Sequence, residues 1–347
     1  MDIAGRPIGK SHLPFVIAEM SGNHNRSLER ALEIVEAAAA AGTHAVKLQT
    51  YTADTITLDI DSPDFRIEDP ASLWSGRTLY ELYAEASTPW EWHKPIFERC
   101  RELGVVCFST PFDETAVDFL ESLDNPVYKI ASFELLHIPL LRRVATTGKP
   151  VILSTGMASV AEIEEAIRTI RAEGNDQIVL LKCTSTYPAS PDDSDLATIP
   201  DMRARFGCEV GISDHTMGVG ASVAAVALGA TVVEKHFTLS RRDGGVDSAF
   251  SLEPAELRSL VEETERAWQA VGSVRYGPTE KERPSLKFRR SLYVGEDMQA
   301  GDTFTPENLR VVRPGYGLPP KLYDELIGRT VARDVSRGTP VSWDILG

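Results

Sequence analysis

The sequence predicts an α/β fold, namely a (β/α)8 TIM barrel followed by a small second domain. Three observations predict it: eight short apolar runs, polar residues at or just past the end of each run, and helical patterns between the runs. Strands that alternate with helices at this spacing form parallel βαβ units, and side chains at the carboxyl ends of eight such strands converge on one mouth. The runs lie at 15–18, 45–49, 105–109, 127–132, 151–153, 178–184, 210–212 and 231–233.

Helical patterns fill most of the stretches between the runs. The first pattern follows Ser27, whose hydroxyl can cap a helix, and stops at Gly42. The remaining helices are predicted at 89–103, 114–122, 135–146, 159–173, 199–206, 218–228 and 254–271. Residues 53–87 break the pattern, because they are polar and form a long insertion after the second strand. Long loops at this face of a barrel are usually functional.

The composition of the chain changes near residue 272. Residues 276–287 are charged and contain Pro278 and Pro284, which predicts a linker between a barrel domain at 1–275 and a second domain at 288–347. The second domain has short alternating segments split by Gly- and Pro-rich turns, which is typical of a β-rich fold. About 60 residues is marginal for an independent domain, so we expect it to dock on a partner surface.

Composition excludes several classes of protein. The 347 residues carry a net charge of −15, which argues against non-specific binding to nucleic acid or to an anionic membrane. No apolar run approaches ~18 residues, and the N-terminus lacks a basic-then-apolar pattern, so we expect no membrane span and a cytoplasmic location. The four cysteines lack paired or metal-ligand spacing and are interpreted as reduced, buried thiols: Cys100, Cys107, Cys183 and Cys208.

Two histidines form the best candidate metal pair. His215 and His236 lie just past the seventh and eighth strands, so their rings can meet at one point. Neutral imidazole suits Mn, Fe or Zn, and a carboxylate with water would complete the coordination shell. Glu19 lies on the other side of the eighth strand. The alternative is that both are structural histidines, since their spacing is no zinc signature.

Two strand-end lysines offer positive charge in an acidic chain. Lys47 and Lys129 are accompanied by a set of hydroxyls that could neutralise a phosphate and a carboxylate. Two alternatives stay open: buried salt bridges to Glu19 and Glu134, or a lysine that forms a Schiff base. Asp247, on the loop after the eighth strand, could bind a substrate hydroxyl or cap a turn. The hydroxyls are Thr110, Ser132, Ser154, Ser185 and Ser213.

Motifs at the strand ends resemble the sialic acid synthase family along nearly the whole chain. Among them are Lys47-Leu48-Gln49-Thr50, Tyr128-Lys129-Ile130-Ala131-Ser132, Ser213-Asp214-His215 and Glu234-Lys235-His236-Phe237-Thr238. Phe288-Arg289-Arg290-Ser291 and Arg313-Pro314-Gly315 resemble parts of that family's antifreeze-like (SAF) C-terminal domain. The resemblance implies a transferase that condenses phosphoenolpyruvate with an N-acylated amino sugar. It also implies a divalent metal, Mn²⁺ or Mg²⁺, and a domain-swapped homodimer.

The same resemblance implies roles for individual residues. Lys47 and Thr110 would bind the carboxylate end of phosphoenolpyruvate, and Lys129 would hold its phosphate together with Ser132, Ser154, Ser185 and Ser213. His215 and His236 would bind the metal. Glu19, Glu134 and Asp247 would contact the sugar or a metal-bound water, with the base left open among them. Gln49 and Tyr187 would face the sugar, and Arg313 of the partner subunit would reach an N-acetyl group.

Two departures from the family pattern bear on the acceptor sugar. Leu48 stands where neuraminate synthases usually have Phe, and residues 245–248 replace their Gly-Pro-Asp-His. Both changes favour a 6-deoxy, 2,4-diacetamido sugar over N-acetylmannosamine. The alternative within the family is the acceptor of neuraminate or legionaminate synthesis. Outside it, a Schiff-base retro-aldol lyase and a non-catalytic carbohydrate-binding barrel remain open.

Overall fold

Eight parallel strands close into a barrel in the first of two units of this computed structural model, which describes residues 1–70 and 72–347. The units are Met1–Gly272 and Ser273–Gly347. Around the barrel the strands follow one another in chain order, and the last pairs with the first, as the sequence predicts. The strands are β3 (Phe15–Glu19), β4 (Ala45–Thr50), β5 (Val106–Pro111), β6 (Tyr128–Ile130), β7 (Val151–Ser154), β8 (Ile178–Cys183), β9 (Glu209–Asp214) and β10 (Val232–His236).

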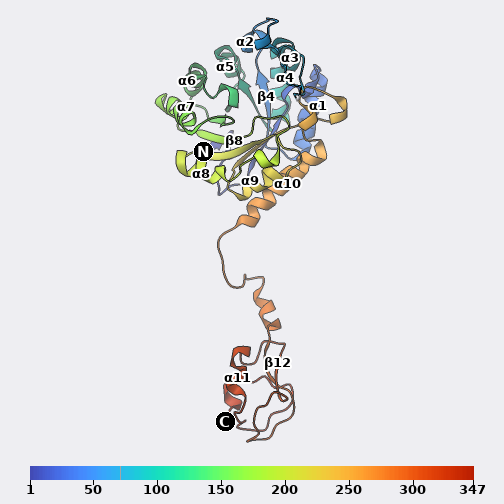
Figure 1. Ribbon diagram of the computed structural model, residues 1–347, viewed down its shortest axis with the longest axis vertical. Helices are drawn as coiled ribbons and strands as arrows, with labels where there is room; N and C mark the ends of the chain where they lie inside the picture. The colour runs from blue at the N-terminus through green and yellow to red at the C-terminus, as the bar shows by residue number, and fades with distance from the viewer. Residues whose placement is uncertain (71) are drawn as a thin grey trace. The chain divides into compact units, whose positions relative to one another are not determined.

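Helices surround the strands, as Figure 1 shows. The first of them, α1, begins after Ser27, whose Oγ accepts a hydrogen bond from the Arg30 N–H at 3.2 Å, and it ends at Gly42, where φ is 89°. Glycine tolerates this left-handed conformation at a helix end. The surrounding helices are α1 (Leu28–Ala41), α4 (Trp90–Glu102), α5 (Glu114–Glu121), α6 (Ile138–Ala145), α7 (Val160–Ala172), α8 (Thr198–Phe206), α9 (Gly220–Ala227) and α10 (Pro254–Val271).

One helix is shorter than its pattern predicts. The prediction places a helix at 135–146, whereas the structure has a 3₁₀ turn, η3 (Ser132–Glu134), and then α6 from Ile138. Pro139 lies in the first turn of α6. Proline has no N–H to donate and a fixed φ, so it is tolerated at a helix start and disfavoured further inside.

Strand side chains alternate between two apolar layers. Phe15, Ile17 and Ala45 pack inside the barrel, whereas Val16, Ala18 and Val46 pack between the strands and the helices. Successive residues of a strand point to opposite faces, so this alternation also sorts the polar strand ends. The inner layer is continued by the odd-numbered ends of β3, β4 and β9 and by the even-numbered end of β10, and the residues between them continue the outer layer.

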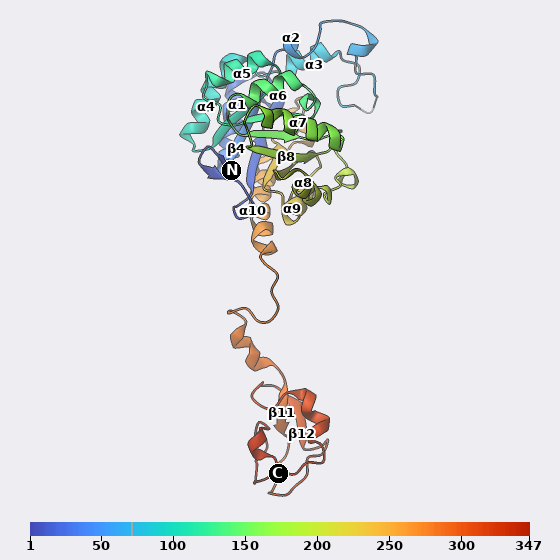
Figure 2. The ribbon, with the colours of Figure 1, turned by 90° about the vertical axis from the view of Figure 1, so that its left-hand side faces the viewer.

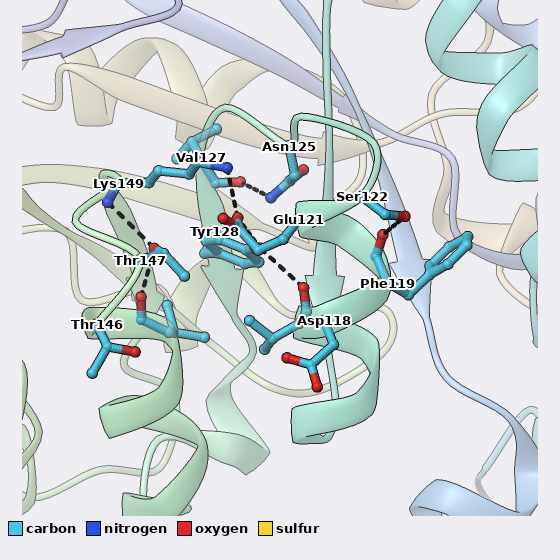
Figure 3. Close-up of polar contacts among 12 residues, drawn as sticks. Asp118, Phe119, Glu121, Ser122, Asn125, Val127, Tyr128, Thr146, Thr147 and Lys149 are labelled. Carbon is cyan, nitrogen blue, oxygen red and sulfur yellow. Dashed lines mark hydrogen bonds and ion pairs between the residues drawn. The ribbon is translucent and has the colours of Figure 1, made fainter.

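The amino end of the barrel is closed by elements that the sequence patterns did not predict. A hairpin of β1 (Asp2–Ile3) and β2 (Arg6–Pro7) brings Ile3 into the interior cluster. Beside β6, Glu121 accepts hydrogen bonds from Tyr128 at 2.6 Å and from Lys149 at 2.5 Å (Figure 3). These contacts tie the α5–β6 and α6–β7 connections together, away from the strand ends that form the mouth.

The predicted insertion at 53–87 carries short elements of its own, and residue 71 within it lies outside the described residues. It contains α2 (Ala53–Ile56), the 3₁₀ turn η2 (Pro63–Phe65) and α3 (Leu79–Ala86). Figure 2 shows α2 and α3 at one end of the barrel, with the loop between them extending outward. Because β4 leads into α2, this is the end at which the strands finish.

The second unit has its own small core. Its two strands, β11 (Ser291–Val294) and β12 (Leu309–Val312), pair antiparallel and match two predicted segments. The other predicted segments, at 303–304 and 330–332, form isolated bridges instead. The unit also contains η7 (Arg283–Phe288), η8 (Pro320–Leu322), α11 (Tyr323–Leu326) and η9 (Trp343–Ile345). Across both units, no described helix is long and apolar enough to cross a membrane.

Candidate active site

The mouth of the barrel holds a buried row of alternating charges. Lys47 Nζ lies 2.7 Å from Glu19 Oε2 and 3.6 Å from Glu234 Oε1, and Lys129 Nζ lies 3.2 Å from the same Glu234 oxygen. All four side chains are less than 5% exposed. The row exists because each residue occupies an inward position two residues after an interior apolar residue, such as Ile17 before Glu19.

Glu234 is the shared partner of both lysines. Burial by itself raises the pKa of this carboxyl, but Lys129 and Lys47 outweigh burial and lower the pKa to about 2. Burial lowers the pKa of Lys129, and nearby Lys47 lowers it further, against the attraction of Glu234. For Lys47, the two carboxylates outweigh burial and raise the pKa. Lys47 is therefore a charged cation and a poor nucleophile, which disfavours it as a Schiff-base lysine.

The salt-bridge alternative for the lysines is correct for one pair and wrong for the other. Lys47 does pair with Glu19, but the ion-pair partner of Lys129 is Glu234 and not Glu134. Glu134 is the last residue of the η3 turn, beyond the end of β6, and therefore does not occupy a strand position as Lys129 and Glu234 do. Burial raises the pKa of Glu134 to about 7, although Lys129 lowers it, and no described residue hydrogen-bonds to its Oε2.

Serine hydroxyls surround a glycine near the strand end that carries Lys129. We call Ser132, Ser154 and Ser185, with Gly156, the hydroxyl cradle. The Gly156 N–H donates to Ser132 Oγ at 3.1 Å, and a Cβ at Gly156 would collide with the hydroxyls of Ser132 and Ser185. Ser154 Oγ is buried without a hydrogen-bond partner among the described residues. Three hydroxyls, one of them without a partner, near a cation suit an anionic oxygen.

Other predicted residues line the same mouth. Thr110 accepts a hydrogen bond from Lys47 at 3.2 Å, and Ser213 donates to Glu234 at 3.1 Å. Gln49 donates to Glu19 Oε1 at 2.9 Å and to Ser21 Oγ at 3.1 Å. Ser21 in turn donates to Asp247. A hydrogen-bonded path therefore runs from the charge row to the loop after β10.

The two candidate metal ligands lie side by side. The ring centroids of His215 and His236 are 5.4 Å apart. The carbonyl of Thr184 lies 2.9 Å from His215 Nδ1, which leaves Nε2 of a neutral ring to carry the lone pair. Burial lowers the pKa of His236 well below its ordinary value, so this imidazole is neutral, as metal ligation requires.

The donors around His236 fit a divalent metal. Its Nδ1 is buried without a hydrogen-bond partner in the described ranges, and Asp247 Oδ2 lies 3.9 Å away. Burial lowers the pKa of His215, but Cys183 and the Thr184 carbonyl outweigh burial and raise it, so this ring would have to lose its proton on binding. Two imidazoles with a nearby carboxylate suit Mn²⁺ and related ions. Among residues 1–70 and 72–347, however, no three His, Cys, Asp or Glu side chains are arranged as a ready-made metal cluster. The two imidazoles would therefore need water or substrate to complete a coordination shell.

Aromatic rings border the imidazole side of the mouth. Tyr187 lies 4.6 Å from His215 and 5.9 Å from Trp74 between ring centroids. Trp74 belongs to the insertion, and its Nε1–H donates to the carbonyl of Val246 at 2.8 Å. The insertion therefore reaches the loop that carries Asp247, which agrees with the expectation that this long segment serves the site.

All predicted site residues of the first unit lie at this mouth. The remaining one, Arg313, belongs to the second unit, where it is exposed. The sequence motifs include Glu234 at a strand end, but sequence reasoning gave it no role, and it did not assign Ser21 or Cys183 to the site. The period-two alternation of β8 and β10 could have identified Cys183 and Glu234. Each stands two residues after an inward-pointing residue, Leu181 and Val232 respectively. The four cysteines are buried and free, as predicted.

A closed (β/α)8 barrel whose mouth gathers lysines, carboxylates, hydroxyls and paired imidazoles is the architecture of a sialic acid synthase-type enzyme. The chain belongs to the NeuB family, whose model matches residues 34–276, and a SAF domain model matches residues 289–346. These matches confirm the family and the fold that the motifs predict.

Individual relatives cover almost the whole chain. It is 44% identical to a pseudaminic acid synthase of Campylobacter jejuni over 93% of this chain and 94% of the relative. It is 41% identical to the pseudaminic acid synthase of Helicobacter pylori over 95% of this chain and 97% of the relative. Among solved structures, an N-acetylneuraminic acid synthetase from Leptospira borgpetersenii, in complex with citrate, is 31% identical with a TM-score of 0.73. That match covers 83% of this chain and 95% of the other.

Proposed function

We propose that this chain is a pseudaminic acid synthase, which condenses phosphoenolpyruvate with 2,4-diacetamido-2,4,6-trideoxy-L-altrose. The products would be pseudaminic acid and phosphate, with cleavage of the C–O bond of phosphoenolpyruvate. The observation that carries the chemistry is the pair of buried lysines beside the hydroxyl cradle and the two imidazoles. The higher identity to pseudaminic acid synthases, 41–44%, than to the neuraminic acid synthetase, 31%, supports this acceptor.

Phosphoenolpyruvate would bind across the charge row. Lys47 and Thr110 would hold its carboxylate, because the ammonium and the hydroxyl are already joined at 3.2 Å on neighbouring strands. Lys129, Ser213 and the hydroxyl cradle would hold its phosphate. The ion pairs with Glu19 and Glu234 keep both lysine chains oriented before the substrate arrives, so little side-chain entropy is lost on binding.

A divalent metal, Mn²⁺ or Mg²⁺, would be held by His215 and His236. When bound, it would supply Lewis-acid polarisation of the aldehyde of the open-chain sugar. Carbon 3 of phosphoenolpyruvate then attacks that aldehyde, water adds at carbon 2, and phosphate leaves. Gln49 and Tyr187 would orient the sugar from opposite sides of the mouth.

These reaction steps require proton transfer, and one of three carboxyls would carry it out. Glu19 is tied to Lys47 and Gln49, and Asp247 accepts a hydrogen bond from Ser21. Glu134 has an oxygen without a partner in the described part of the chain and a pKa of about 7. A pKa near the working pH suits a group that both accepts and donates protons, so Glu134 is our preferred candidate.

The proposal includes a cytoplasmic, domain-swapped homodimer whose linker spans 276–287. In it, Arg313 of the partner subunit would contact an N-acetyl group of the sugar.

A mixture of Arg313→Ala and Lys129→Met chains tests this role of Arg313, because one of the two sites in each heterodimer would be intact. Random exchange of equal amounts predicts recovery of up to about a quarter of wild-type activity. No recovery despite proven heterodimers would mean that Arg313 serves its own barrel or neither.

The activity itself is tested by product mass. The protein is mixed with phosphoenolpyruvate, Mn²⁺ and a panel of N-acylated sugars, including the acceptors of neuraminate and legionaminate synthesis. We expect the diacetamido trideoxy sugar to give the preferred product. Preference for another acceptor would support the runner-up, a neuraminate or legionaminate synthase. Borohydride trapping of a substrate on a lysine would instead favour a Schiff-base lyase.

A further inference from the structure

One ion pair at the ends of β9 and β10 faces away from the mouth. Asp214 and Lys235 occupy positions that continue Ile212 and Val233, both of which pack in the apolar layer between strands and helices. Their side chains are each 1% exposed. A carboxylate and an ammonium in an apolar layer need a reason, because each loses its hydration there.

The pair is the centre of a fully buried polar cluster. Lys235 Nζ lies 2.8 Å from Asp214 Oδ2, and these two residues are register neighbours across β9 and β10. Lys235 Nζ also donates to the carbonyl of Thr216 at 2.6 Å. Asp214 Oδ1 accepts from both the N–H and the hydroxyl of Thr216 at 2.8 Å, and Oδ2 accepts from Ser222 of α9 at 2.6 Å. We call Asp214, Lys235, Thr216 and Ser222 the β9–β10 clamp.

Each charged member of the clamp immediately precedes an imidazole of the candidate metal pair. Asp214 comes before His215, and Lys235 comes before His236. Neighbouring residues of a strand point to opposite faces but share a continuous backbone. A contact that fixes the backbone at Asp214 or Lys235 therefore also fixes the Cα from which the next side chain, an imidazole, extends. The clamp joins the two strands at these positions and, through Thr216, also holds the turn that follows His215.

His236 depends on such backbone support more than His215 does. The carbonyl of Thr184 fixes the ring of His215, whereas Nδ1 of His236 has no hydrogen-bond partner among the described residues. The His236 ring packs against Phe250, at 4.9 Å between ring centroids, and against His215, at 5.4 Å, and its position otherwise depends largely on its backbone. Loss of the clamp would therefore change the spacing between the two rings.

Stability alone does not account for the pair. A buried ion pair can often be replaced by well-packed apolar residues without loss of stability, because the desolvation of both charges offsets their attraction. The strands on either side contribute apolar residues to this layer, so the ion pair itself could be replaced there, although Thr216 and Ser222 would then lose their partners. What an apolar pair could not supply is the directed set of hydrogen bonds to Thr216 and Ser222.

We propose that Asp214 and Lys235 are positioning residues, which hold His215 and His236 at the spacing needed to bind a divalent metal. This inference rests on the proposed function, since it assumes that the two imidazoles bind the metal. It assigns a role in the reaction to two side chains that contact neither substrate nor metal.

The test replaces both charges at once. The double variant Asp214→Leu/Lys235→Met removes the ion pair without leaving an unpaired buried charge. Its melting temperature should fall, because Thr216 and Ser222 lose hydrogen-bond partners. At a temperature where circular dichroism shows the variant folded, we expect its affinity for Mn²⁺, measured by calorimetry, to fall roughly 10- to 100-fold. The catalytic constant at saturating phosphoenolpyruvate and sugar should recover as Mn²⁺ is raised.

A matched control uses the ion pair at the other end of the barrel. Glu121→Leu/Lys149→Met also removes an ion pair, the one drawn in Figure 3, and should leave Mn²⁺ affinity unchanged. If the main double variant fails to fold, Asp214→Asn serves instead, because its amide oxygen can still accept from Thr216. It should weaken Mn²⁺ binding at least several-fold.

The outcomes separate the inference from the proposed function. Wild-type Mn²⁺ affinity in a folded Asp214→Leu/Lys235→Met chain, or in Asp214→Asn, would overturn the positioning role alone. Equal loss of affinity in the Glu121→Leu/Lys149→Met control would also overturn it, because the effect would then be a general loss of rigidity. A wild-type chain that binds no Mn²⁺ and makes no product would overturn the proposed function instead.

Discussion

Lys129→Met tests the proposed phosphate site most directly. Methionine has nearly the length of lysine, so the change removes the ammonium without opening a large cavity. In the wild-type chain this ammonium lies 3.2 Å from Glu234 and beside the hydroxyl cradle. The variant should fold, because Glu234 keeps Lys47 as a second partner at 3.6 Å and is not left as an unpaired buried charge.

The expected magnitude follows from the lost contact. Removing a charge-assisted hydrogen bond from a closed site costs on the order of 2–3 kcal/mol, or roughly 30- to 150-fold in affinity for phosphoenolpyruvate. Glu234 adds to this cost, because without Lys129 its negative charge is less fully neutralised and repels the phosphate more strongly. We therefore expect a loss in the upper half of that range, with the Michaelis constant for the sugar changing much less.

The assay is phosphate release at saturating sugar and Mn²⁺, with phosphoenolpyruvate varied. Lys149→Met is the matched control, since it removes another ion-paired lysine, at 2.5 Å from Glu121, far from the mouth. Its Michaelis constant for phosphoenolpyruvate should equal that of the wild type. An unchanged constant in a folded Lys129→Met chain would refute the phosphate role and leave Lys129 as a structural partner of Glu234.

Three further predictions concern other parts of the site. His236→Ala should abolish detectable Mn²⁺ binding in calorimetry while the circular dichroism melt stays near wild type; retained affinity would rule out His236 as a ligand. Burial raises the pKa of Glu134 from 4.5 to about 7, so wild-type stability should fall as pH rises through that window. Glu134→Gln should therefore be more stable than wild type at pH 8 by about 3 kcal/mol in urea unfolding, and equal at pH 4; no gain at pH 8 would contradict the shift. Gly156→Ala should raise the Michaelis constant for phosphoenolpyruvate at least tenfold, because its Cβ would displace the hydroxyls of Ser132 and Ser185; a wild-type value would exclude the hydroxyl cradle as the phosphate site.

The barrel and most of its mouth could be predicted from strand patterns. An apolar run of period two that ends in a polar residue gives both the strand and the face of its last side chain, as for Ile17 and Glu19. The position of a strand end around the mouth also follows from chain order, because each strand of this barrel pairs with its sequence neighbours.

Partners across the mouth could not be predicted in the same way. Whether Lys129 meets Glu134 or Glu234 depends on the stagger of the strands and on the η3 turn, and neither is encoded in the spacing of one segment. Asp214 and Lys235 are a different case: their place at the strand ends suggests mouth residues, but the period of two after Ile212 and Val233 correctly predicts that they point outward. The β1–β2 hairpin was missed because two-residue strands have no readable period.

The alternation at the strand ends has a consequence for redesign of the enzyme. At Ser213-Asp214-His215 and Glu234-Lys235-His236, the outer and inner residues alternate one by one, so a library that varies whole tripeptides would damage alignment and chemistry together. Searches for new acceptor sugars should leave Asp214 and Lys235 unchanged and concentrate diversity on the insertion around Trp74 and on the loop around Val246. Those segments meet above the mouth, and neither belongs to the barrel strands.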